Sequence, residues 1–330
     1  MSFLKSTLNL LADGLFHSEK EISHFLGSPR RIVPETLQGL VELGINLEKV
    51  DKKGYRIPEG LELLNEKLIF NELGDTNQLL NQLEILTSIG STNTYLLDSA
   101  INSKKHAVFA EQQTAGRGQF NRPWLSSNFG KNIALSLLGH LPNQPDKLTG
   151  LSLVMGLAVV QALEEYGLND IKLKWPNDIV YQDKKLAGIL IETRSAKSGF
   201  YTVVIGIGLN LYNPITNLHS IDINQAITNI YSIQKRPPQR NRLAGLLLKN
   251  SLITLSEFQS KDFAIFIEAW QKLDNLRDKS IQIQTSNDTL EGIARGINSK
   301  GQLCIDIEGK RCFFSSGEVR ISLNHGSGNC

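Results

Sequence analysis

The sequence predicts an α+β protein of several domains, with helices first, a mixed α/β region in the middle and short strands at the end. Apolar residues recur at helical spacing through residues 3–44, β-type runs alternate with longer helical runs over 67–273, and five short alternating runs follow residue 279. We therefore divide the chain into residues 1–66, 67–273 and 274–325. A chain of 330 residues is long enough to bury a substantial core.

Composition and charge exclude several classes of protein. Apolar residues make up 41% and charged residues 21%, as in soluble globular proteins. The longest apolar run, Leu151 to Val160, is about half a membrane span, and the N-terminus lacks the pattern of a signal peptide. We therefore expect a cytoplasmic protein without a membrane segment. The net charge of +2 does not indicate general affinity for nucleic acid.

The cysteines indicate neither disulfides nor zinc. The chain has three, Cys304, Cys312 and Cys330, and none has the spacing of a metal site.

The first domain has the pattern of three short helices followed by a hairpin. Residues 3–13 form the first helix, Ser18 with Glu21 fits a capping box that opens the second, and Ser28-Pro29 begins the third. Residues 45–50 and 55–57 then form a hairpin. This order is typical of a winged helix-turn-helix, which places one helix in the major groove of DNA. A small dimerisation or regulatory module that touches no DNA is the alternative.

Two features weigh against DNA binding. Pro34 falls at the sixth position of the third predicted helix, where proline costs about 3 kcal/mol, so this helix either kinks or starts late. Residues 1–66 also carry eight Lys/Arg against ten Asp/Glu, whereas phosphate contacts need cations. The candidate DNA contacts are Arg30, Arg31, Lys52 and Lys53.

The middle of the chain alternates strands with longer helices. We expect strands at residues 84–89, 107–112, 132–138, 171–175, 185–193 and 201–208, and helices near 93–100, 148–166 and 239–258. This pattern indicates a mixed sheet with many hairpins rather than a doubly wound parallel sheet.

A glycine- and arginine-rich segment, residues 116–124, is the strongest local sign of a ligand site. Glycines let backbone N–H groups approach an oxygen-rich ligand, and a guanidinium supplies charge and paired donors. A solvated turn is the alternative from composition alone. Other candidate ligand residues also have a purely structural interpretation. Ser91 and Thr92 can simply cap a helix, and Lys172 with Lys174 can form a solvated strand face.

Five motifs, taken in order, closely resemble the bifunctional bacterial biotin-protein ligases that also repress the biotin operon. They are Ser91-Thr92-Asn93, the segment 116–124, Lys174-Trp175-Pro176-Asn177-Asp178, the run from Lys185 to Glu192, and Gly206-Ile207-Gly208-Leu209-Asn210. The similarity runs from about residue 8 to about residue 323. It implies a class II synthetase-like (SH2-like) catalytic domain between a winged helix-turn-helix and an SH3-like β-barrel.

The resemblance also implies which residues hold biotin. Ser91, Thr92, Asn93 and Gln113 would bind the ureido ring, since an amide offers both a donor and an acceptor, with Gln112 as the weaker candidate. Arg117, Gly118 and Gln119 would belong to the loop that covers biotin and its adenylate. Gly188, Gly206 and Gly208 interrupt apolar strands, which marks bulges or close backbone approach and would make room for a flat bicyclic ligand.

The catalytic roles and the ATP site follow from the same resemblance. Lys185, chosen over Lys184, would bridge the biotin carboxylate and the α-phosphate, with Arg117 beside it. Asp178 would orient Lys185 and help to hold Mg²⁺, directly or through water. The remaining expected ATP contacts are Lys174, Asn177, Asn210 and Arg122.

The chain departs from the common family pattern at Gln119, where most members have arginine. A neutral amide keeps hydrogen bonds but removes a charge, so we expect looser retention of the acyl-adenylate, with Arg122 restoring part of the positive potential. Trp124 is expected to pack at the base of the loop, and residues 212–224 are a candidate lid.

Five short strands after residue 279 suggest a small β-barrel. They are expected at 280–284, 289–298, 303–308, 310–315 and 318–323, separated by turn signals, before a disordered tail at 324–330. The resemblance gives this domain a part in binding ATP and the carrier protein.

The sequence thus predicts a biotin-[acetyl-CoA-carboxylase] ligase that uses ATP and Mg²⁺. Its partners would be the biotin carboxyl carrier protein, biotin operator DNA and a second copy of the chain when biotinyl-AMP is bound. Three alternatives stay open: a lipoate ligase, a biotin-responsive regulator with secondary ligase activity, and a ligase whose DNA binding is lost.

Overall fold

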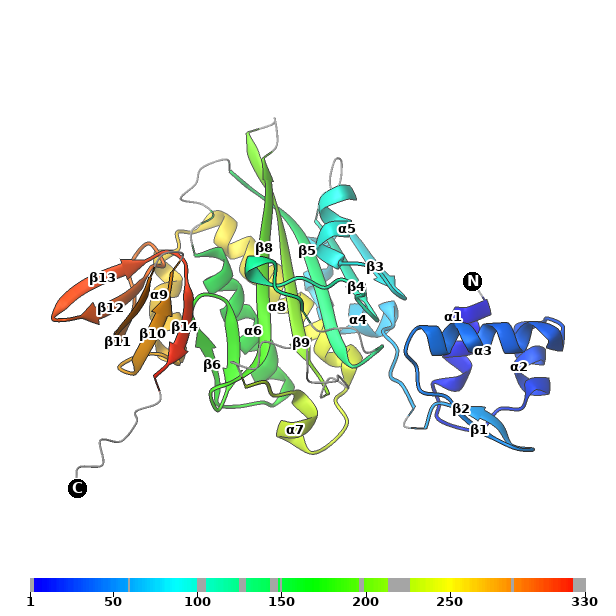
Figure 1. Cartoon of the computed structure of the whole chain (residues 1–330). Helices are drawn as coiled ribbons and strands as arrows, with labels where there is room; N and C mark the ends of the chain where they lie inside the picture. The colour runs from blue at the N-terminus through cyan, green and yellow to red at the C-terminus, as the bar shows by residue number, and fades with distance from the viewer. Residues whose placement is uncertain are drawn as a thin grey trace, which may run out of the picture.

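The structure is a computed structural model that describes residues 3–58, 60–99, 105–124, 129–142, 148, 150–195, 199–212, 226–285 and 288–322. Three parts follow one another along the molecule (Figure 1): a helical N-terminal module, a central sheet with its helices, and a C-terminal group of strands. The predicted lid at 212–224 and the tail at 324–330 lie outside the described residues, except for Tyr212. No helix of the described chain is long and apolar enough to cross a membrane.

The N-terminal module contains the three predicted helices and the hairpin. These are α1 (Phe3–Leu11), α2 (Glu19–Leu26), α3 (Val33–Glu42), β1 (Glu48–Val50) and β2 (Gly54–Arg56). The capping box is confirmed: the Glu21 N–H donates to Ser18 Oγ, and the Ser18 N–H donates to Glu21 Oε2 at 2.7 Å. Gly27 ends α2 in the left-handed region, as only glycine does without strain. The module has a small hydrophobic core of its own, which includes Leu8, Leu11 and Ile22.

The third helix starts later than its sequence pattern indicated. Residues Arg30–Ile32 form a 3₁₀ turn, and α3 begins only at Val33, which places Pro34 within its first turn. A proline there loses no intrahelical hydrogen bond, because the first N–H groups of a helix have no partner inside it. The prediction that Ser28-Pro29 opens this helix was therefore wrong, and Pro34 carries none of the expected cost.

The central sheet has seven strands in the order β3-β4-β5-β9-β8-β7-β6. All neighbours are antiparallel except β3 with β4. The bounds are β3 (Gln82–Leu86), β4 (His106–Ala110), β5 (Asn132–Pro142), β6 (Ile171–Lys174), β7 (Asp178–Tyr181), β8 (Lys184–Ser195) and β9 (Phe200–Asn210). The expectation of a mixed, hairpin-rich sheet is confirmed.

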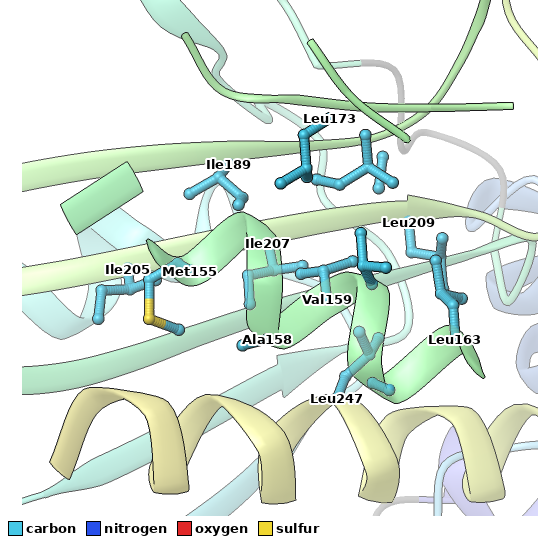
Figure 2. Close-up of a cluster of buried hydrophobic side chains, with 14 of the residues drawn as sticks. Met155, Ala158, Val159, Leu163, Leu173, Ile189, Ile205, Ile207, Leu209 and Leu247 are labelled. Atoms are coloured by element: carbon cyan, nitrogen blue, oxygen red, sulfur yellow. The ribbon is translucent and has the colours of Figure 1, made fainter. Parts of the chain in front are cut away.

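Two long helices, α6 (Leu151–Tyr166) and α8 (Arg240–Ser260), form the layer behind this sheet (Figure 1). Figure 2 shows Met155, Val159 and Leu163 of α6 between Ile205 and Ile207 of β9 on one side and Leu247 of α8 on the other. This apolar layer takes one face of the strands. Because strand side chains alternate between faces, the opposite face is left for other residues.

Helix α5 (Thr92–Ser99) packs against the opposite face of the sheet. Its Leu96 is fully buried with Val108, Leu138 and Val204 in a small cluster of their own. This contact holds the N-terminal end of α5 over β5 and β9, where the small residues of the sheet lie.

The C-terminal strands form one antiparallel sheet in the order β13-β12-β11-β10-β14. The bounds are β10 (Ser280–Gln284), β11 (Thr289–Ile297), β12 (Leu303–Ile307), β13 (Lys310–Phe314) and β14 (Glu318–Ile321), within a few residues of every prediction. Trp175 Nε1 donates to the Gly301 carbonyl at 3.1 Å. The end of β6 is thereby joined to the loop between β11 and β12.

Several elements had no clear sequence signal. They are β7, α4 (Glu66–Leu73), α7 (Ile230–Gln234), α9 (Ala264–Leu273) and 3₁₀ turns at Gly74–Leu79 and Gln119–Asn121. Short elements such as β7 carry too few residues for a periodic pattern, so their formation depends on tertiary pairing.

A polar network, buried at Arg240, Asn241 and Glu111, joins the N-terminal module to the catalytic region. The Glu62 carboxylate accepts from the N–H groups of Arg240 and Asn241 at 2.6 and 2.9 Å. The Arg240 guanidinium also pairs with buried Glu111, which accepts from the Leu64 N–H at 2.7 Å. Arg240 and Asn241 thus hold the linker against the first turn of α8. Removing one partner of the buried Arg240–Glu111 ion pair would be costly, because it would leave the other charge uncompensated.

Candidate functional site

A cavity of about 330 Å³ opens on the sheet face opposite α6 and α8. This size and its mixture of apolar walls with a few convergent polar groups are typical of a small-molecule site. The predicted biotin, ATP and catalytic residues line it, apart from the weaker candidate Gln112: Ser91, Thr92, Asn93, Gln113, Arg117, Gly118, Gln119, Arg122, Lys174, Asn177, Asp178, Lys185, Gly188 and Asn210.

The floor of the cavity is a row of small residues that crosses four strands. Ala134 of β5 pairs with Gly208 of β9, Gly208 pairs with Gly188 of β8, and Gly188 pairs with Asp178 of β7. Residues paired across a sheet share one face, so this row lies side by side. The register leaves space above the sheet and places a carboxylate at its edge.

One end of the cavity is polar and is organised by the first turn of α5. The Gln113 amide oxygen accepts from the Thr92 N–H at 2.9 Å and from Thr92 Oγ1 at 3.0 Å. Thr92 Oγ1 in turn accepts from Ser136 Oγ at 2.7 Å. Ser91 is also buried, and its Oγ lies 3.5 Å from the Thr94 N–H, the capping contact expected of a serine there.

Asn93 links this polar end to the glycine strands. Its Nδ2 donates to Glu192 Oε2 at 2.9 Å, and its Oδ1 accepts from Ser136 Oγ. A Cβ on Gly206 would clash with Asn93 Oδ1, so glycine is required for this approach. In this structure Gly206 thus makes room for a protein side chain.

The other end of the cavity is charged. Lys185 Nζ lies 2.6 Å from Asp178 Oδ1, an ion pair between the second residue of β8 and the first residue of β7. Burial lowers the pKa of nearby Lys174; Asp178 opposes this shift, and Lys185 adds to it. Two lysines that converge on one carboxylate leave an excess of positive charge, which an anionic ligand would neutralise.

The glycine-arginine loop folds back on itself over the cavity. Its Gly118 N–H donates to the Arg122 carbonyl at 2.7 Å, and its Trp124 N–H donates to the Gly116 carbonyl at 2.8 Å. Phe120 at the tip has a positive φ of 56° and is 64% exposed. The segment lines the cavity, so the alternative of a merely solvated turn does not describe it.

Trp124 was expected to pack at the base of the loop. In the structure its indole lines the cavity. A Cβ on Gly208 would clash with the indole, and one on Gly188 would come within 3.2 Å of it. The Lys185 ammonium is 5.6 Å from the ring centroid, within the range of a cation–π contact. The space that the glycines create above β8 and β9 is therefore filled by this indole.

Arg117 points away from the lysines. Its guanidinium pairs with Glu192 at 2.8 Å and donates to Thr94 Oγ1 at 2.9 Å. Arg122 pairs with Glu318 of β14, which holds the pKa of that carboxyl below its usual value. Both arginines of the loop are thus paired with acids in this arrangement.

The resemblance gave the C-terminal domain a part in binding ATP, but sequence reasoning named none of the residues through which it reaches the cavity. Gly317, Glu318, Val319 and Arg320 line the cavity, as do Phe120 and Ile227. Nothing in the alternating pattern of β14 distinguishes it from an ordinary strand, so no signal in the sequence identified it. The 227–228 segment is held by main-chain hydrogen bonds to Lys185, with the Thr228 N–H donating to the Lys185 carbonyl at 2.8 Å.

The two asparagines that were expected to contact ATP donate hydrogen bonds to main-chain carbonyl groups. Asn177 Nδ2 donates to the Ile189 carbonyl at 2.6 Å, and Asn210 Nδ2 donates to the Thr228 carbonyl at 3.2 Å. These bonds fix both side chains at the wall of the cavity.

The four candidate DNA contacts lie far along the chain from this cavity. Arg30 and Arg31 are exposed in the 3₁₀ turn before α3, and Lys52 and Lys53 are exposed in the turn between β1 and β2. Their exposure is compatible with phosphate contacts.

Comparisons with known proteins agree with this site. Residues 85–210 match the biotin/lipoate A/B protein ligase family, and residues 278–321 match the biotin protein ligase C-terminal domain. The chain is 34% identical to the bifunctional ligase/repressor BirA of Escherichia coli over 94% of this chain and 95% of that protein. It is 29% identical to the biotin–[acetyl-CoA-carboxylase] ligase of Mycobacterium tuberculosis over 78% of this chain and 95% of that protein.

Among solved structures, the biotin protein ligase from Aquifex aeolicus in complex with biotin and ATP superposes with a TM-score of 0.63. It is 27% identical, and the match covers 74% of this chain and all of that one. The family matches lie on the sheet and strands that build the cavity, and the BirA similarity extends over both ends of the chain. This chain therefore belongs to the biotin protein ligase family.

Proposed function

We propose that this chain activates biotin with ATP to biotinyl-5′-AMP and transfers biotin to one lysine of the biotin carboxyl carrier protein of acetyl-CoA carboxylase. The observation that carries the proposal is the small-residue floor, Ala134-Gly208-Gly188, which runs to the Asp178–Lys185 pair. A flat apolar acid would lie on this floor, with its carboxylate at the charged end, after the Trp124 indole that covers Gly188 and Gly208 has moved aside. The activity named for the ligase relatives supports the same chemistry.

The polar end of the cavity suits the ureido ring of biotin. Thr92 and Gln113 bring a hydroxyl and an amide to one point, and Ser91 and Asn93 lie in the same buried turn. A ureido group has one carbonyl acceptor and two N–H donors, so it needs partners of both kinds. A buried polar site of this type strongly rejects ligands that leave its groups unpaired.

The charged end is where the adenylate would form. An oxygen of the biotin carboxylate attacks the α-phosphorus of ATP, the bond from that phosphorus to the bridging oxygen breaks, and pyrophosphate leaves with the electron pair. Lys185 would stabilise the negative charge shared by both reactants, with Asp178 holding its ammonium in place at 2.6 Å. Arg117 would join this end after leaving Glu192.

Transfer then needs no protein nucleophile. The neutral amine of the carrier lysine attacks the carbonyl carbon of the mixed anhydride, the carbon–oxygen bond to the phosphate breaks, and AMP leaves with the electron pair. The nitrogen loses one proton to solvent and becomes an amide. The adenylate supplies the good leaving group, so correct positioning of the amine does the rest.

ATP would lie along Lys174, Asn177, Asn210 and Arg122, between the sheet and β14. No group of three or more potential metal ligands occurs among the described residues, so a metal cage made of protein alone does not fit. Mg²⁺ is commonly held by one carboxylate with phosphate oxygens and water, and Asp178 fits that arrangement. Bound there, Mg²⁺ would neutralise phosphate charge.

We extend the proposal to transcription. The three helices and the hairpin support a winged helix-turn-helix in residues 1–66. We further propose a class II synthetase-like (SH2-like) catalytic domain at 67–273 and an SH3-like barrel at 274–325. The relative named only as a ligase covers 78% of the chain, whereas BirA covers 94%. A repressor that binds operator DNA as a dimer when biotinyl-AMP is present fits this difference.

Biotin-dependent exchange of labelled pyrophosphate into ATP tests the enzymatic proposal. We expect exchange with biotin and Mg²⁺ and none with lipoate, because lipoate lacks the ureido group that the Thr92–Gln113 end would recognise. Exchange with lipoate alone would assign the chain to the other branch of its matched family. Absence of exchange with either acid would refute the ligase proposal.

A further inference from the structure

A second cavity, of about 450 Å³, adjoins the first along the glycine-arginine loop. Residues 117–120 line both cavities, so this stretch is a shared wall. The remaining walls come from residues 190–192 of β8, Ser152 and Pro176, and residues 315–317 before β14. The second cavity thus gives a route to the loop that does not pass over the polar end of the first.

This second cavity has one acid and one base among its lining residues. The acid is Glu192 and the base is Arg117, and they pair with each other at 2.8 Å. The Glu192 side chain is only 23% exposed, so its carboxylate is partly desolvated. Without Arg117 it would keep one neutral donor, Asn93 Nδ2, and no cation at this distance on the described walls.

The proposed reaction draws Arg117 away from Glu192. The adenylate carries a phosphate. Arg117 contacts both Glu192 oxygens through Nη2 alone, and a guanidinium that turns to pair with phosphate through two of its nitrogens gives up this contact. An uncompensated, partly buried carboxylate is unfavourable and attracts another cation. The second substrate of the proposed reaction carries such a cation, since a lysine side chain is an ammonium ion in neutral solution.

We propose that the second cavity is the access site for the acceptor lysine of the carrier protein, and that Glu192 binds its ammonium once Arg117 has turned to the adenylate. Binding the lysine is thereby coupled to formation of the intermediate, because the anionic site is neutralised by Arg117 until then. The ammonium gives one proton to solvent through the open cavity before its nitrogen attacks. This inference rests on the proposed ligase function.

The test uses the full-length protein loaded with chemically prepared biotinyl-5′-AMP, so that it bypasses adenylate formation. Two nucleophiles are compared in single turnovers: a biotin carboxyl carrier domain, and hydroxylamine, which is uncharged at neutral pH and small. For Glu192→Gln we expect the ratio of the carrier rate to the hydroxylamine rate to fall about tenfold relative to wild type, as loss of a charged contact of about 1.4 kcal/mol gives. Glu268→Gln, an exposed acid on α9, should leave the ratio unchanged.

A second variant tests the route itself. Ser316 is exposed at the mouth of the cavity, and Ser316→Arg adds bulk and positive charge there. We again expect the ratio to fall, and the fall should shrink at high salt because the repulsion is screened. An unchanged ratio in Ser316→Arg, or equal slowing of both nucleophiles in Glu192→Gln, would overturn the access site. Absence of pyrophosphate exchange in wild type would instead refute the ligase proposal.

Discussion

Lys185 is the residue on which the proposed chemistry depends most. Its ammonium is fixed by Asp178 at one end of the cavity, with Trp124 beside it. We expect Lys185→Ala to lower the rate of adenylate formation about 100- to 1,000-fold, the usual effect of removing one group that stabilises transition-state charge. Pyrophosphate exchange measures it. The control is Lys184→Ala, which removes the exposed neighbour; equal losses in both variants would show that the assignment to Lys185 is wrong.

Asp274, after α9, has a pKa raised to about 6 because its carboxyl is buried, although its Oδ1 accepts from the Leu276 N–H. The folded protein therefore binds this proton more tightly than the unfolded chain, and the cost of ionisation is fully present above pH 6 and is lost as the pH falls toward 3.8. We expect Asp274→Asn to stabilise the protein by up to about 3 kcal/mol above the folded pKa.

Thermal unfolding at several pH values measures this effect. The gain of Asp274→Asn over wild type should shrink as the pH is lowered through the interval between 6 and 3.8. A gain that stays constant with pH would contradict ionisation of this carboxyl as its origin. No sequence pattern indicated Asp274, because burial of a single acid between domains depends on long-range packing.

At the scale of elements, the glycine-arginine loop should move when ligands bind. The Trp124 indole fills the space over Gly188 and Gly208 that a flat ligand would need. The other two tryptophans, Trp175 and Trp270, are 2% and 1% exposed, and the indole of Trp175, which also lines the cavity, is held by the Gly301 carbonyl. We expect biotin with ATP to change the tryptophan emission of wild type and Trp124→Phe to abolish the change. A signal that survives this substitution would contradict displacement of the indole.

Gln119 of the same loop should affect how tightly biotinyl-5′-AMP is retained. Gln119 lines both cavities and carries no charge. Gln119→Arg should slow release of biotinyl-5′-AMP about threefold, because an added pair with phosphate at a partly exposed site gives at most about 1 kcal/mol. Release is measured by capture of the free adenylate, with Gln119→Leu as the control that cannot donate. Equal release from wild type and Gln119→Arg would refute the expected effect.

Elements were predictable where the pattern was long or the ends were marked. The strands after residue 279 and helices α6 and α8 appear within a few residues of their expected places, since several alternating or helical positions agree within each. The start of α3 was misplaced because proline at 29 and proline at 34 both fit a first helical turn, and only packing of Val33 selects the later one. Strand β7 gave too short a pattern and depends on its pairing with β8.

At the scale of the molecule, the motifs identified the residues of the site but not how distant strands come together to form the cavity. The register that aligns Ala134, Gly208 and Gly188 is a property of three paired strands, and no single motif contains it. The contribution of Glu318 and Arg320 likewise requires β14 to fold against the catalytic sheet. Long-range placement of this kind has no local signal.

The N-terminal module is attached to the rest of the molecule at more than one point. Gln112 Nε2 donates to the Leu43 carbonyl at the end of α3 at 3.1 Å, and the next residue, Gln113, bonds to Thr92 in the cavity. Phe129 packs in the core of the module. Neighbouring residues thus contact the end of α3 and the ligand cavity.

DNA binding is the property that this arrangement should serve. With Pro34 in the first turn of α3, the helix is intact, and Arg30, Arg31, Lys52 and Lys53 are exposed for phosphate contacts. We expect the protein with biotin and ATP to retard the operator of the biotin genes of its own genome in a gel shift at low salt, and the affinity to fall steeply as salt is raised.

The control for this experiment alters charge without touching the cavity. Replacing Arg31 and Lys52 by alanine should weaken retardation and reduce the salt dependence by about one unit of slope for each phosphate that is no longer bound, while pyrophosphate exchange stays at the wild-type rate. Because residues 1–66 have more acidic than basic residues, retardation depends on where these few cations lie rather than on net charge. Wild-type protein that leaves the operator unshifted with both ligands present would show a ligase whose helical module has kept its fold without its DNA contacts.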